Sequence, residues 1–277
     1  MLELWVTEYQ TPALGFSCKI VETLKVEQTA FQHLAVVVTE QFGRMLLLDG
    51  MVMTTDADEF VYHEMITNIA LNSHPNPQNV LIIGGGDGGA LREAVRHPQV
   101  KQATLVEIDG QVIEAAKQYF PELSCSFTDP KARVVVDDGI AYVQQKQNEF
   151  DIILVDSTEP VGPAVQLFSP EFYRACGAAL KDDGMLVVQS ESPFFNANVI
   201  KQAFGNIQKI FPLTKLYLAS IPTYPSGLWS FTVGSKKYDP EQPLHKNENI
   251  LKYYNEDIHR AAFKLPGFVS DIIGANK

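Results

Sequence analysis

The run from Val80 to Gly89 places the strongest constraint on the fold of this chain, because an apolar segment passes there into a glycine-rich loop. Val80–Ile83 has the composition of a buried parallel strand, and Ala90–Val95 resumes a helical pattern. A strand, a glycine turn and a helix bring backbone N–H groups and the positive end of a helix up to a ligand. The run therefore predicts a ligand site at the carboxyl end of a strand.

The acid inside the glycine loop indicates which ligand the loop suits. Gly84, Gly86 and Gly89 match the dinucleotide pattern G-x-G-x-x-G, which alone is a weak signal. Asp87 would face the pyrophosphate of a dinucleotide, and this repulsion costs roughly 4 kcal/mol at ~4 Å and an effective dielectric of about 20. The loop is better suited to a ligand whose nearest group is cationic.

We predict two domains, a small β domain over residues 1–57 and a larger α/β domain over residues 58–277. Stretches rich in β-formers alternate with hairpin turns through the first domain, and Asp49-Gly50 is one such turn. A helix at Asp58–Leu71 then opens the second domain, because its apolar residues recur at near-helical spacing.

After the glycine loop, apolar strands alternate with helices, which is the pattern of a parallel, doubly wound sheet. Two last strands, Leu213–Ser220 and Leu228–Gly234, are separated only by residues 221–227, too few for a crossover helix. We expect them to form an antiparallel pair that closes the sheet. The other predicted strands are Ala103–Ile108, Arg133–Val136, Phe150–Val155 and Met185–Gln189, with helices that begin near Gly110, Gly139, Ser169 and Asn196.

The composition narrows the class of protein. The net charge of −11 argues against nucleic acid and anionic membranes as partners, and it fits a cationic substrate. Cys18, Cys125 and Cys176 are isolated and odd in number, which predicts reduced thiols in a cytoplasmic protein. We expect no signal peptide and no membrane span, because the N-terminus lacks a basic region and no apolar run reaches ~18 residues.

Acidic residues follow four of the predicted strands at their carboxyl ends, where an open parallel sheet binds its ligands. Helix N-capping is an alternative explanation for Asp109, Asp138 or Asp156 taken singly. Capping does not explain why so many acids converge, because crowded carboxylates repel unless a cation lies among them. The converging acids are Asp87, Glu107, Asp138, Asp156 and Glu159.

The position of each acid predicts its role. Glu107 ends the second strand, where it can accept hydrogen bonds from two ribose hydroxyls, and Asp138 can accept one from an adenine amine. These two residues predict an adenosine ligand, whose remainder points at Asp87 and should carry a positive charge and no phosphate. Asp156 and Glu159 would then face a second, cationic substrate.

Other chemistries lack their motifs in this sequence. No G-x-x-x-x-G-K-[ST] run is present for phosphate transfer, and no G-x-S-x-G elbow for acyl transfer. The helix around His63 lacks the second His of a zinc site, so we expect no metal. His63 alone is by default a polar residue on a helix.

Four separated motifs resemble, in the same order, those of the spermidine synthases, the polyamine aminopropyltransferases. They are Asp58–Met65, Gly84–Gly89, Asp156–Ala164 and Ile221–Gly227, and the resemblance covers roughly residues 3–270. It implies a class I methyltransferase-like fold behind an N-terminal β domain, in a homodimer or homotetramer. It also implies transfer of an aminopropyl group from decarboxylated S-adenosylmethionine, a co-substrate rather than a cofactor, to putrescine, which yields spermidine and 5'-methylthioadenosine.

The resemblance further implies a role for each matching residue. The adenosyl part of the donor would be held by Gln32, Glu107, Asp138, Gly139 and Pro163. The amines would be bound by His63, Asp87 and the Asp156–Glu159 stretch, with Asp156 as the base and Tyr62 and Tyr224 lining the acceptor channel. Glu159 departs from the Asp that many members have, which keeps the charge but bears on the preferred diamine length.

The chemistry implied by the resemblance explains why an acid is needed beside the acceptor. A sulfonium is already a good leaving group, so the donor requires no metal. An alkylamine with a pKa of ~10.4 is neutral in only about one molecule per 2,500 at pH 7, which costs roughly 4.6 kcal/mol. Asp156 can take the proton if burial or its neighbour Glu159 raises its pKa.

Alternatives remain open from the sequence. The acceptor could be another amine, such as cadaverine, agmatine or spermidine. A methyltransferase with the same sheet would use ordinary S-adenosylmethionine, and Asp87 speaks against it. A catalytically silent nucleoside-binding protein would not need Asp156 and two tyrosines, and a dehydrogenase is the most distant alternative.

The N-terminal strands carry many apolar residues for a small β layer, namely Val36, Val38, Leu46, Leu48 and Val52. We expect a second subunit to bury some of them, in a symmetric dimer or a multiple of it. The alternative is that they cover the chain's own sheet.

Overall fold

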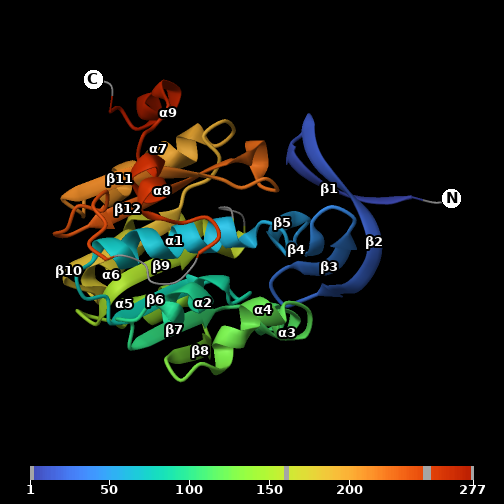
Figure 1. The fold of residues 1–277 in the computed structure, drawn as a ribbon, viewed down its shortest axis with the longest axis horizontal. Coiled ribbons are helices and arrows are strands. Elements are labelled where there is room, and N and C mark those ends of the chain that lie inside the picture. The colour runs from blue at the N-terminus through green and yellow to red at the C-terminus, as the bar shows by residue number, and fades with distance from the viewer. Residues whose placement is uncertain (1–2, 159–161, 246–250, 276–277) are drawn as a thin grey trace.

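The structure is a computed structural model of the chain, and it describes all residues except 1–2, 159–161, 246–250 and 276–277. Its described part contains one sheet of five strands and one of seven (Figure 1). Among the described residues, no helix combines the length and the apolar character that a membrane crossing requires.

The first sheet is antiparallel, and its strands pair in sequence order, as expected for consecutive hairpins. Asp49 and Gly50 form the two-residue turn between the last two strands, with φ values of 50° and 84° that this tight turn requires. The strands are β1 (Leu4–Thr11), β2 (Leu14–Gln28), β3 (His33–Thr39), β4 (Gly43–Leu48) and β5 (Met51–Thr55).

The second sheet has the order β11-β12-β10-β9-β6-β7-β8, which confirms the predicted doubly wound fold. The five strands from β10 to β8 are parallel, while β12 and β11 join one edge as an antiparallel pair. These strands are β6 (Asn79–Gly84), β7 (Gln102–Glu107), β8 (Ala132–Val136), β9 (Phe150–Asp156), β10 (Leu180–Gln189), β11 (Leu213–Ser220) and β12 (Leu228–Ser235).

Alternate residues of the central strands face two separate cores, one on each side of the sheet. Ile152 and Leu154 of β9 belong to the core under the first layer of helices, while Ile153 and Val155 belong to the opposite core. The first layer contains α1 (Glu59–Ser73), α2 (Gly89–Arg96) and α8 (Glu256–Ala262), and the second contains α5 (Gly139–Gln144), α6 (Pro170–Ala179) and α7 (Ala197–Gln208).

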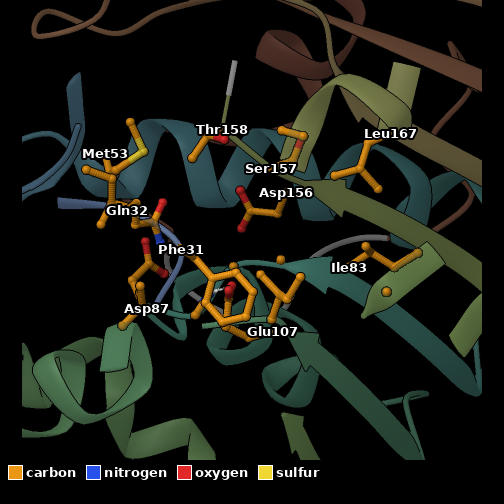
Figure 2. A pocket seen from close by; sticks show the side chains of 18 of the residues that line it. Phe31, Gln32, Met53, Ile83, Asp87, Glu107, Asp156, Ser157, Thr158 and Leu167 are labelled. Atoms are coloured by element: carbon orange, nitrogen blue, oxygen red, sulfur yellow. Dashed lines mark hydrogen bonds between the residues drawn. The ribbon is translucent and has the colours of Figure 1, made fainter. Parts of the chain in front are cut away.

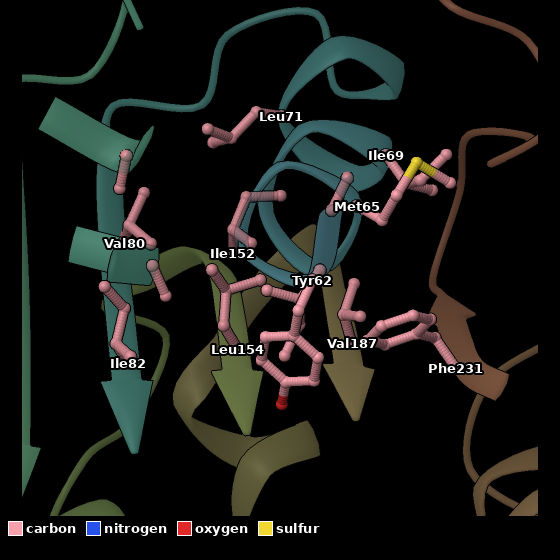
Figure 3. Packing of buried hydrophobic residues seen from close by; sticks show 14 of the residues in the cluster. Tyr62, Met65, Ile69, Leu71, Val80, Ile82, Ile152, Leu154, Val187 and Phe231 are labelled. Atoms are coloured by element: carbon pink, nitrogen blue, oxygen red, sulfur yellow. The ribbon is translucent and has the colours of Figure 1, made fainter. Parts of the chain in front are cut away.

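Helix α1 is the central element of the first layer, and residues 61–73 are all buried. Figure 3 shows its apolar side chains, including Met65 and Ile69, above Ile152, Leu154 and Val187 of the sheet. A helix that is buried on all sides must give its polar side chains partners inside the protein. The polar residues of the Asp58–Met65 motif therefore point to specific contacts rather than to solvent.

The expectation that a second subunit buries Val36, Leu46 and Leu48 is wrong, because the chain itself buries them. They pack against α3 (Gly110–Tyr119) and α4 (Pro121–Ser124), so β3 and β4 dock on the second domain (Figure 1). Val52 is buried within its own sheet, and Val38 is half-buried. Within the described strands of this sheet, the large apolar side chains that remain exposed lie on β1 and β2 instead: Leu4, Trp5, Tyr9, Leu14, Val21 and Val26.

The predicted elements agree with the observed ones to within a few residues, with one longer strand. β10 begins at Leu180 rather than Met185, because Leu180 already pairs with Phe150 before a register shift. In the part of the chain that the structure describes, the remaining helix is α9 (Gly267–Ile272), and the 3-10 helices are η1 (Cys125–Thr128), η2 (Gly162–Phe168) and η3 (Pro225–Gly227). The boundary predicted at 57/58 falls between β5 and α1.

Candidate active site

The glycine loop lies directly against the end of β9, and this contact explains its first two glycines. Gly85 N–H donates a hydrogen bond to the carbonyl oxygen of Asp156 over 2.8 Å. A Cβ on Gly84 would come within 2.1 Å of that oxygen, and both glycines have positive φ, 83° and 67°. The loop thus brings the ends of β6 and β9 together around one cavity.

The cavity lies at the carboxyl ends of the parallel strands, between the two domains (Figure 2). Of the predicted site residues, it is lined by Gln32, Tyr62, His63, Asp87, Glu107, Asp138, Gly139, Asp156 and Tyr224. The N-terminal domain contributes apolar lining that the sequence did not indicate, including Phe31, Met51 and Met53. Figure 2 shows Asp87, Glu107 and Asp156 arranged around the same space.

The structure does not describe the side chains of two predicted site residues. Glu159 lies outside the described residues, so its predicted contact with an amine stays a prediction. Of Pro163, the structure gives only its place in η2.

Glu107 is buried, and backbone groups hold both of its oxygens. Oε1 accepts a hydrogen bond from Asp109 N–H at 2.8 Å, and Oε2 accepts one from Gly86 N–H at 3.2 Å. Burial raises the pKa of Glu107 to about 7, although these two N–H groups favour its ionised form. Each carboxylate oxygen can accept a second hydrogen bond, so Glu107 can still receive a pair of hydroxyls.

Asp87 is buried and already has partners for both oxygens. Oδ1 accepts a hydrogen bond from Gly89 N–H at 2.7 Å, and Oδ2 lies 3.4 Å from His63 Nε2. Burial acts to raise the pKa of Asp87, but the His63 cation and the Gly89 N–H group outweigh it and hold the pKa below its usual value. Asp87 thus accepts the N–H group of the first residue of α2 and lines the cavity at the same time.

Asp156 is the opposite case, a carboxylate with little to stabilise its charge. Tyr62 Oη donates a hydrogen bond to Oδ1 over 2.7 Å, while Oδ2 is buried and finds no partner within the described part of the chain. Burial, followed by the nearby Asp87 charge, raises the pKa of Asp156 to about 6. Asp156 does not cap a helix, so that alternative is wrong for this residue.

The two tyrosines meet beside Asp156, with ring centroids 5.6 Å apart. Burial raises the pKa of both phenols well above 10, so they remain hydrogen-bond donors at neutral pH. Tyr224 Oη donates to the carbonyl oxygen of Met53 over 2.7 Å, which joins the turn after β11 to the N-terminal domain. Asp58 secures the same turn by accepting hydrogen bonds from the N–H and hydroxyl groups of Thr223.

Gln32 and Asp138 occupy the rim of the cavity. The Gln32 amide donates to Asp109 Oδ2 over 3.0 Å, so the N-terminal domain is tied to the residue that caps α3. Asp138 caps α5, because its Oδ1 accepts from Ile140 N–H at 2.8 Å, and it is exposed to the cavity. Capping and ligand contact are compatible for a carboxylate, since its second oxygen stays available.

A second recess continues from the cavity past the two tyrosines, and its far wall was missed from the sequence. Glu8, Gln189 and Trp229 line it, together with Met51 and Met53. Glu8 is buried, and its Oε2 accepts a hydrogen bond from Val52 N–H at 2.8 Å. Glu8 was missed because an isolated Glu in a predicted strand has no sequence pattern that indicates a binding site.

Among the described residues, one group could place three metal-ligand atoms close together, within 4.8 Å: His74, Asp151 and Asp183. It lies at the opposite end of the sheet from the cavity. Lys181 Nζ already pairs with Asp151 at 2.8 Å, and His74 Nδ1 accepts a hydrogen bond from the backbone N–H of Asn76. The neutral His74 ring therefore carries its proton on Nε2, which is unsuitable for a metal ligand.

The fold and the cavity define a class of protein. A class I methyltransferase-like sheet carries a glycine loop, a strand-end acid suited to ribose, and two further buried acids, with no phosphate-binding loop. This arrangement suits an enzyme that uses an adenosyl sulfonium and a cationic co-substrate.

The comparisons with known proteins identify the family. A spermine/spermidine synthase domain matches residues 59–246, and a spermidine synthase tetramerisation domain matches residues 4–56. The chain belongs to the polyamine aminopropyltransferases, which confirms the resemblance inferred from the four motifs.

The similarity extends over the whole chain. It is 56% identical to a polyamine aminopropyltransferase of Caldicellulosiruptor bescii, covering 98% of this chain and 99% of that protein. It is 54% identical to one of Bacillus subtilis, covering 99% and 100%. A crystal structure of spermidine synthase in complex with the transition state analogue AdoDATO superposes with a TM-score of 0.96 at 44% identity, covering 98% of this chain and 95% of that one.

Proposed function

We propose that this aminopropyltransferase uses decarboxylated S-adenosylmethionine as donor and putrescine as acceptor, and releases spermidine and 5'-methylthioadenosine. The observation that carries the proposal is Asp156, whose carboxylate has a raised pKa and one buried oxygen without a partner among the described residues. A second acid, Asp87, lines the same cavity and has a partner for each of its two oxygens. The similar spermidine synthase structure with a bound transition state analogue supports the same reaction.

The donor occupies the side of the cavity beside the glycine loop. Glu107 accepts hydrogen bonds from the ribose hydroxyls, and Asp138 accepts one from the adenine amine. Gln32, Gly139 and Pro163 complete the adenosyl site. Asp87 attracts the ammonium of the aminopropyl group and repels the extra carboxylate of ordinary S-adenosylmethionine.

The acceptor occupies the side beside β9, between the rings of Tyr62 and Tyr224. Its reacting amine lies against Asp156, and Glu159, which lies outside the described residues, keeps its predicted role as a second acid for the amine. The recess past the tyrosines extends toward Glu8, whose buried carboxylate suits the distal ammonium of a diamine. Putrescine carries an ammonium group at each end, so it can pair with Asp156 and Glu8 at the same time.

Each step of the reaction uses a group that the cavity provides. Asp156 accepts a proton from the acceptor ammonium, and the freed nitrogen attacks the aminopropyl carbon bound to sulfur. The new C–N bond forms as the C–S bond breaks, and the sulfonium leaves as the neutral thioether of methylthioadenosine. Alignment of nitrogen, carbon and sulfur supplies the rest of the rate.

The direct test is a product assay with the purified protein. Decarboxylated S-adenosylmethionine and putrescine should give spermidine and methylthioadenosine in equal amounts, at a rate above those with cadaverine, agmatine or spermidine. A faster rate with one of these amines would replace putrescine as the acceptor. Methyl transfer from ordinary S-adenosylmethionine, with no aminopropyl transfer, would overturn the reaction itself.

We also propose that the protein assembles into a tetramer through its N-terminal sheet. The matched tetramerisation domain spans this sheet, and Trp5, Tyr9 and Val21 expose more than half of their surface on β1 and β2. Light scattering at micromolar concentration should give four times the chain mass of 30.8 kDa, and twice that mass would limit the assembly to a dimer. A mass equal to one chain would contradict the proposal, and Trp5→Ser with Tyr9→Ser should lower the observed mass.

A further inference from the structure

Behind Asp87 lies a buried row of alternating charges that the reaction does not use directly. Glu59 forms a forked pair with Arg92, in which Nη1 and Nη2 donate to its two oxygens over 3.0 and 2.9 Å. Glu59 Oε2 also lies 2.7 Å from His63 Nδ1, and Arg92 Nε donates to Glu93 over 2.7 Å. The row therefore runs from Asp87 through His63 and Glu59 to Arg92.

The position of His63 in this row fixes its protonation. One ring nitrogen faces Glu59, and the other faces Asp87, so both can donate only if the ring is an imidazolium. Burial acts to lower the pKa of His63, but the Asp87 and Glu59 carboxylates raise it well above its usual value. An imidazolium has no lone pair to accept a hydrogen bond from an ammonium.

The last glycine of the motif is explained by the same ring. A Cβ on Gly89 would lie 2.2–2.4 Å from three atoms of the His63 ring, so a larger residue would displace the ring. His63 is 2% exposed, although it borders the cavity. Gly89 thus allows α1 and α2 to approach closely enough for His63 to reach Asp87.

We propose that Glu59, His63 and Arg92 form a positioning relay that holds the Asp87 carboxylate, and that His63 acts on the substrate amine through Asp87 rather than by contacting it. This inference rests on the proposed function and revises the amine-binding role that we predicted for His63. Glu59 and Arg92 become functional residues although neither borders the cavity.

The relay has a specific consequence for binding. A freely rotating or protonated Asp87 would bind the donor ammonium poorly, because a buried carboxylate needs a fixed partner to stay ionised. Imidazolium supplies that partner, and the forked Glu59–Arg92 pair fixes the imidazolium. The relay should therefore affect ligands that carry the ammonium and leave methylthioadenosine, which lacks it, unaffected.

A double-mutant cycle tests whether His63 acts through Asp87. Binding of decarboxylated S-adenosylmethionine and of methylthioadenosine is measured by calorimetry for wild type, His63→Gln, Asp87→Asn and the double variant. His63→Gln should weaken the decarboxylated donor by about tenfold or more and change methylthioadenosine less than about twofold. In the Asp87→Asn background, the same substitution should have little further effect. Additive losses would show that His63 contacts the amine directly and would overturn the proposal.

Glu59→Gln tests the far end of the relay, with Glu64→Gln as its matched control. Glu64 is another acid of α1 and is buried, but it accepts backbone N–H groups of residues 252–254 and does not border the cavity. Glu59→Gln should reproduce the selective loss of donor binding, while Glu64→Gln should lower the melting temperature and leave both ligand affinities within about twofold. Equal ligand affinities in the two variants would contradict the relay.

A spectroscopic measurement keeps this inference separate from the proposed function, because it needs no substrate. The groups around His63 are Glu59 on α1, Asp87 in the loop before α2, Arg92 on α2 and Asp156 on β9. In ¹⁵N spectra of wild type, both His63 nitrogens should carry protons at pH 8, and Glu59→Gln should lose one proton there. A neutral His63 ring in wild type would overturn the relay even if spermidine is formed, and absent turnover with an imidazolium would count against the function alone.

Discussion

The two halves of the cavity hold their carboxylates in opposite ways. Beside the glycine loop, Asp87 accepts a backbone N–H group and faces an imidazolium, and this cation holds its pKa low against the effect of burial. Beside β9, Asp156 receives one hydrogen bond from Tyr62, and burial raises its pKa to about 6. The two acids line one cavity, and burial acts to raise the pKa of both, so the opposite directions of their pKa shifts come from charge and hydrogen bonds.

This difference separates binding from proton transfer. A carboxylate whose charge is stabilised before the ligand arrives attracts a cation without becoming protonated. A carboxylate whose charge is poorly stabilised has a pKa closer to neutrality and is a better general base. Asp87 fits the first description, and Asp156 fits the second. A substitution at or beside one of these acids should therefore change either donor binding or proton transfer, and leave the other nearly unchanged.

The largest effect is expected from Asp156→Asn, which removes the base and keeps the shape of the side chain. Turnover should fall by ~10²–10⁴, because an amide cannot accept the amine proton. The affinity for decarboxylated S-adenosylmethionine should stay within about threefold, since Asp87 is untouched. Single-turnover kinetics and calorimetry measure the two quantities, and turnover within tenfold of wild type would remove Asp156 from this role.

Asp87→Asn should change donor selection instead of the proton transfer. Repulsion between Asp87 and the extra carboxylate of ordinary S-adenosylmethionine is worth up to ~4 kcal/mol, and screening reduces it to about half. This corresponds to a preference on the order of thirtyfold for the decarboxylated donor. Asp87→Asn should narrow that ratio, whereas a fixed ratio with unchanged affinities would mean that Asp87 only accepts the Gly89 N–H group at the start of α2.

The raised pKa of Asp156 also predicts that the base destabilises the fold. An acid near 6 in the folded state and near 3.9 when unfolded reduces stability as the pH rises between these values, by ~3 kcal/mol once both are passed. Asp156→Asn removes this cost but weakens the hydrogen bond from Tyr62, which leaves a gain of ~1–2 kcal/mol at pH 8.

Calorimetric melting measures this gain, and low pH is its internal control. The variant should melt about 2–6 °C above wild type at pH 8. The difference should disappear near pH 3, because Asp156 is then mostly protonated in both the folded and the unfolded protein. A variant that is less stable than wild type at pH 8 would show that the Asp156 charge is stabilised by groups other than Tyr62.

The sequence predicted the strand ends well because apolar runs and glycine turns are local signals. The parallel strands and the antiparallel closing pair follow from them, and Asp87, Glu107 and Asp156 then converge by topology alone. The direction in which the N-terminal apolar residues face could not be predicted in this way. Leu46 and Leu48 lie on the same face of their strand, and the sequence pattern is the same whether that face is covered by the chain itself or by a second subunit. Only the docking of this face on α3 decides which.

The contacts behind the site were also beyond the sequence, for a different physical reason. Glu59 and Arg92 are ordinary helix residues until α1 and α2 pack together and exclude water around them. Glu8 reaches the second recess from β1, far away in the chain. The surroundings of such side chains form by packing between distant segments, so residue type and spacing do not predict their role.

The smallest expected effect is that of Tyr62→Phe, which widens the difference between the two acids by leaving the Asp156 charge still less stabilised. The Tyr62 hydroxyl donates to the ionised carboxylate and lowers its pKa, so its removal should raise that pKa by about one unit. The acidic limb of the kcat/KM profile should move to higher pH by the same amount, and activity at pH 7 should fall about twofold, because the ionised fraction of the base there falls from about nine-tenths to about half. Glu107, with a pKa of about 7, also contributes to this limb but is common to both proteins.

Tyr217→Phe is the matched control, because its buried hydroxyl donates to the Met65 carbonyl and does not line the cavity. An unchanged profile with reduced turnover would mean that Tyr62 orients the acceptor without tuning the base.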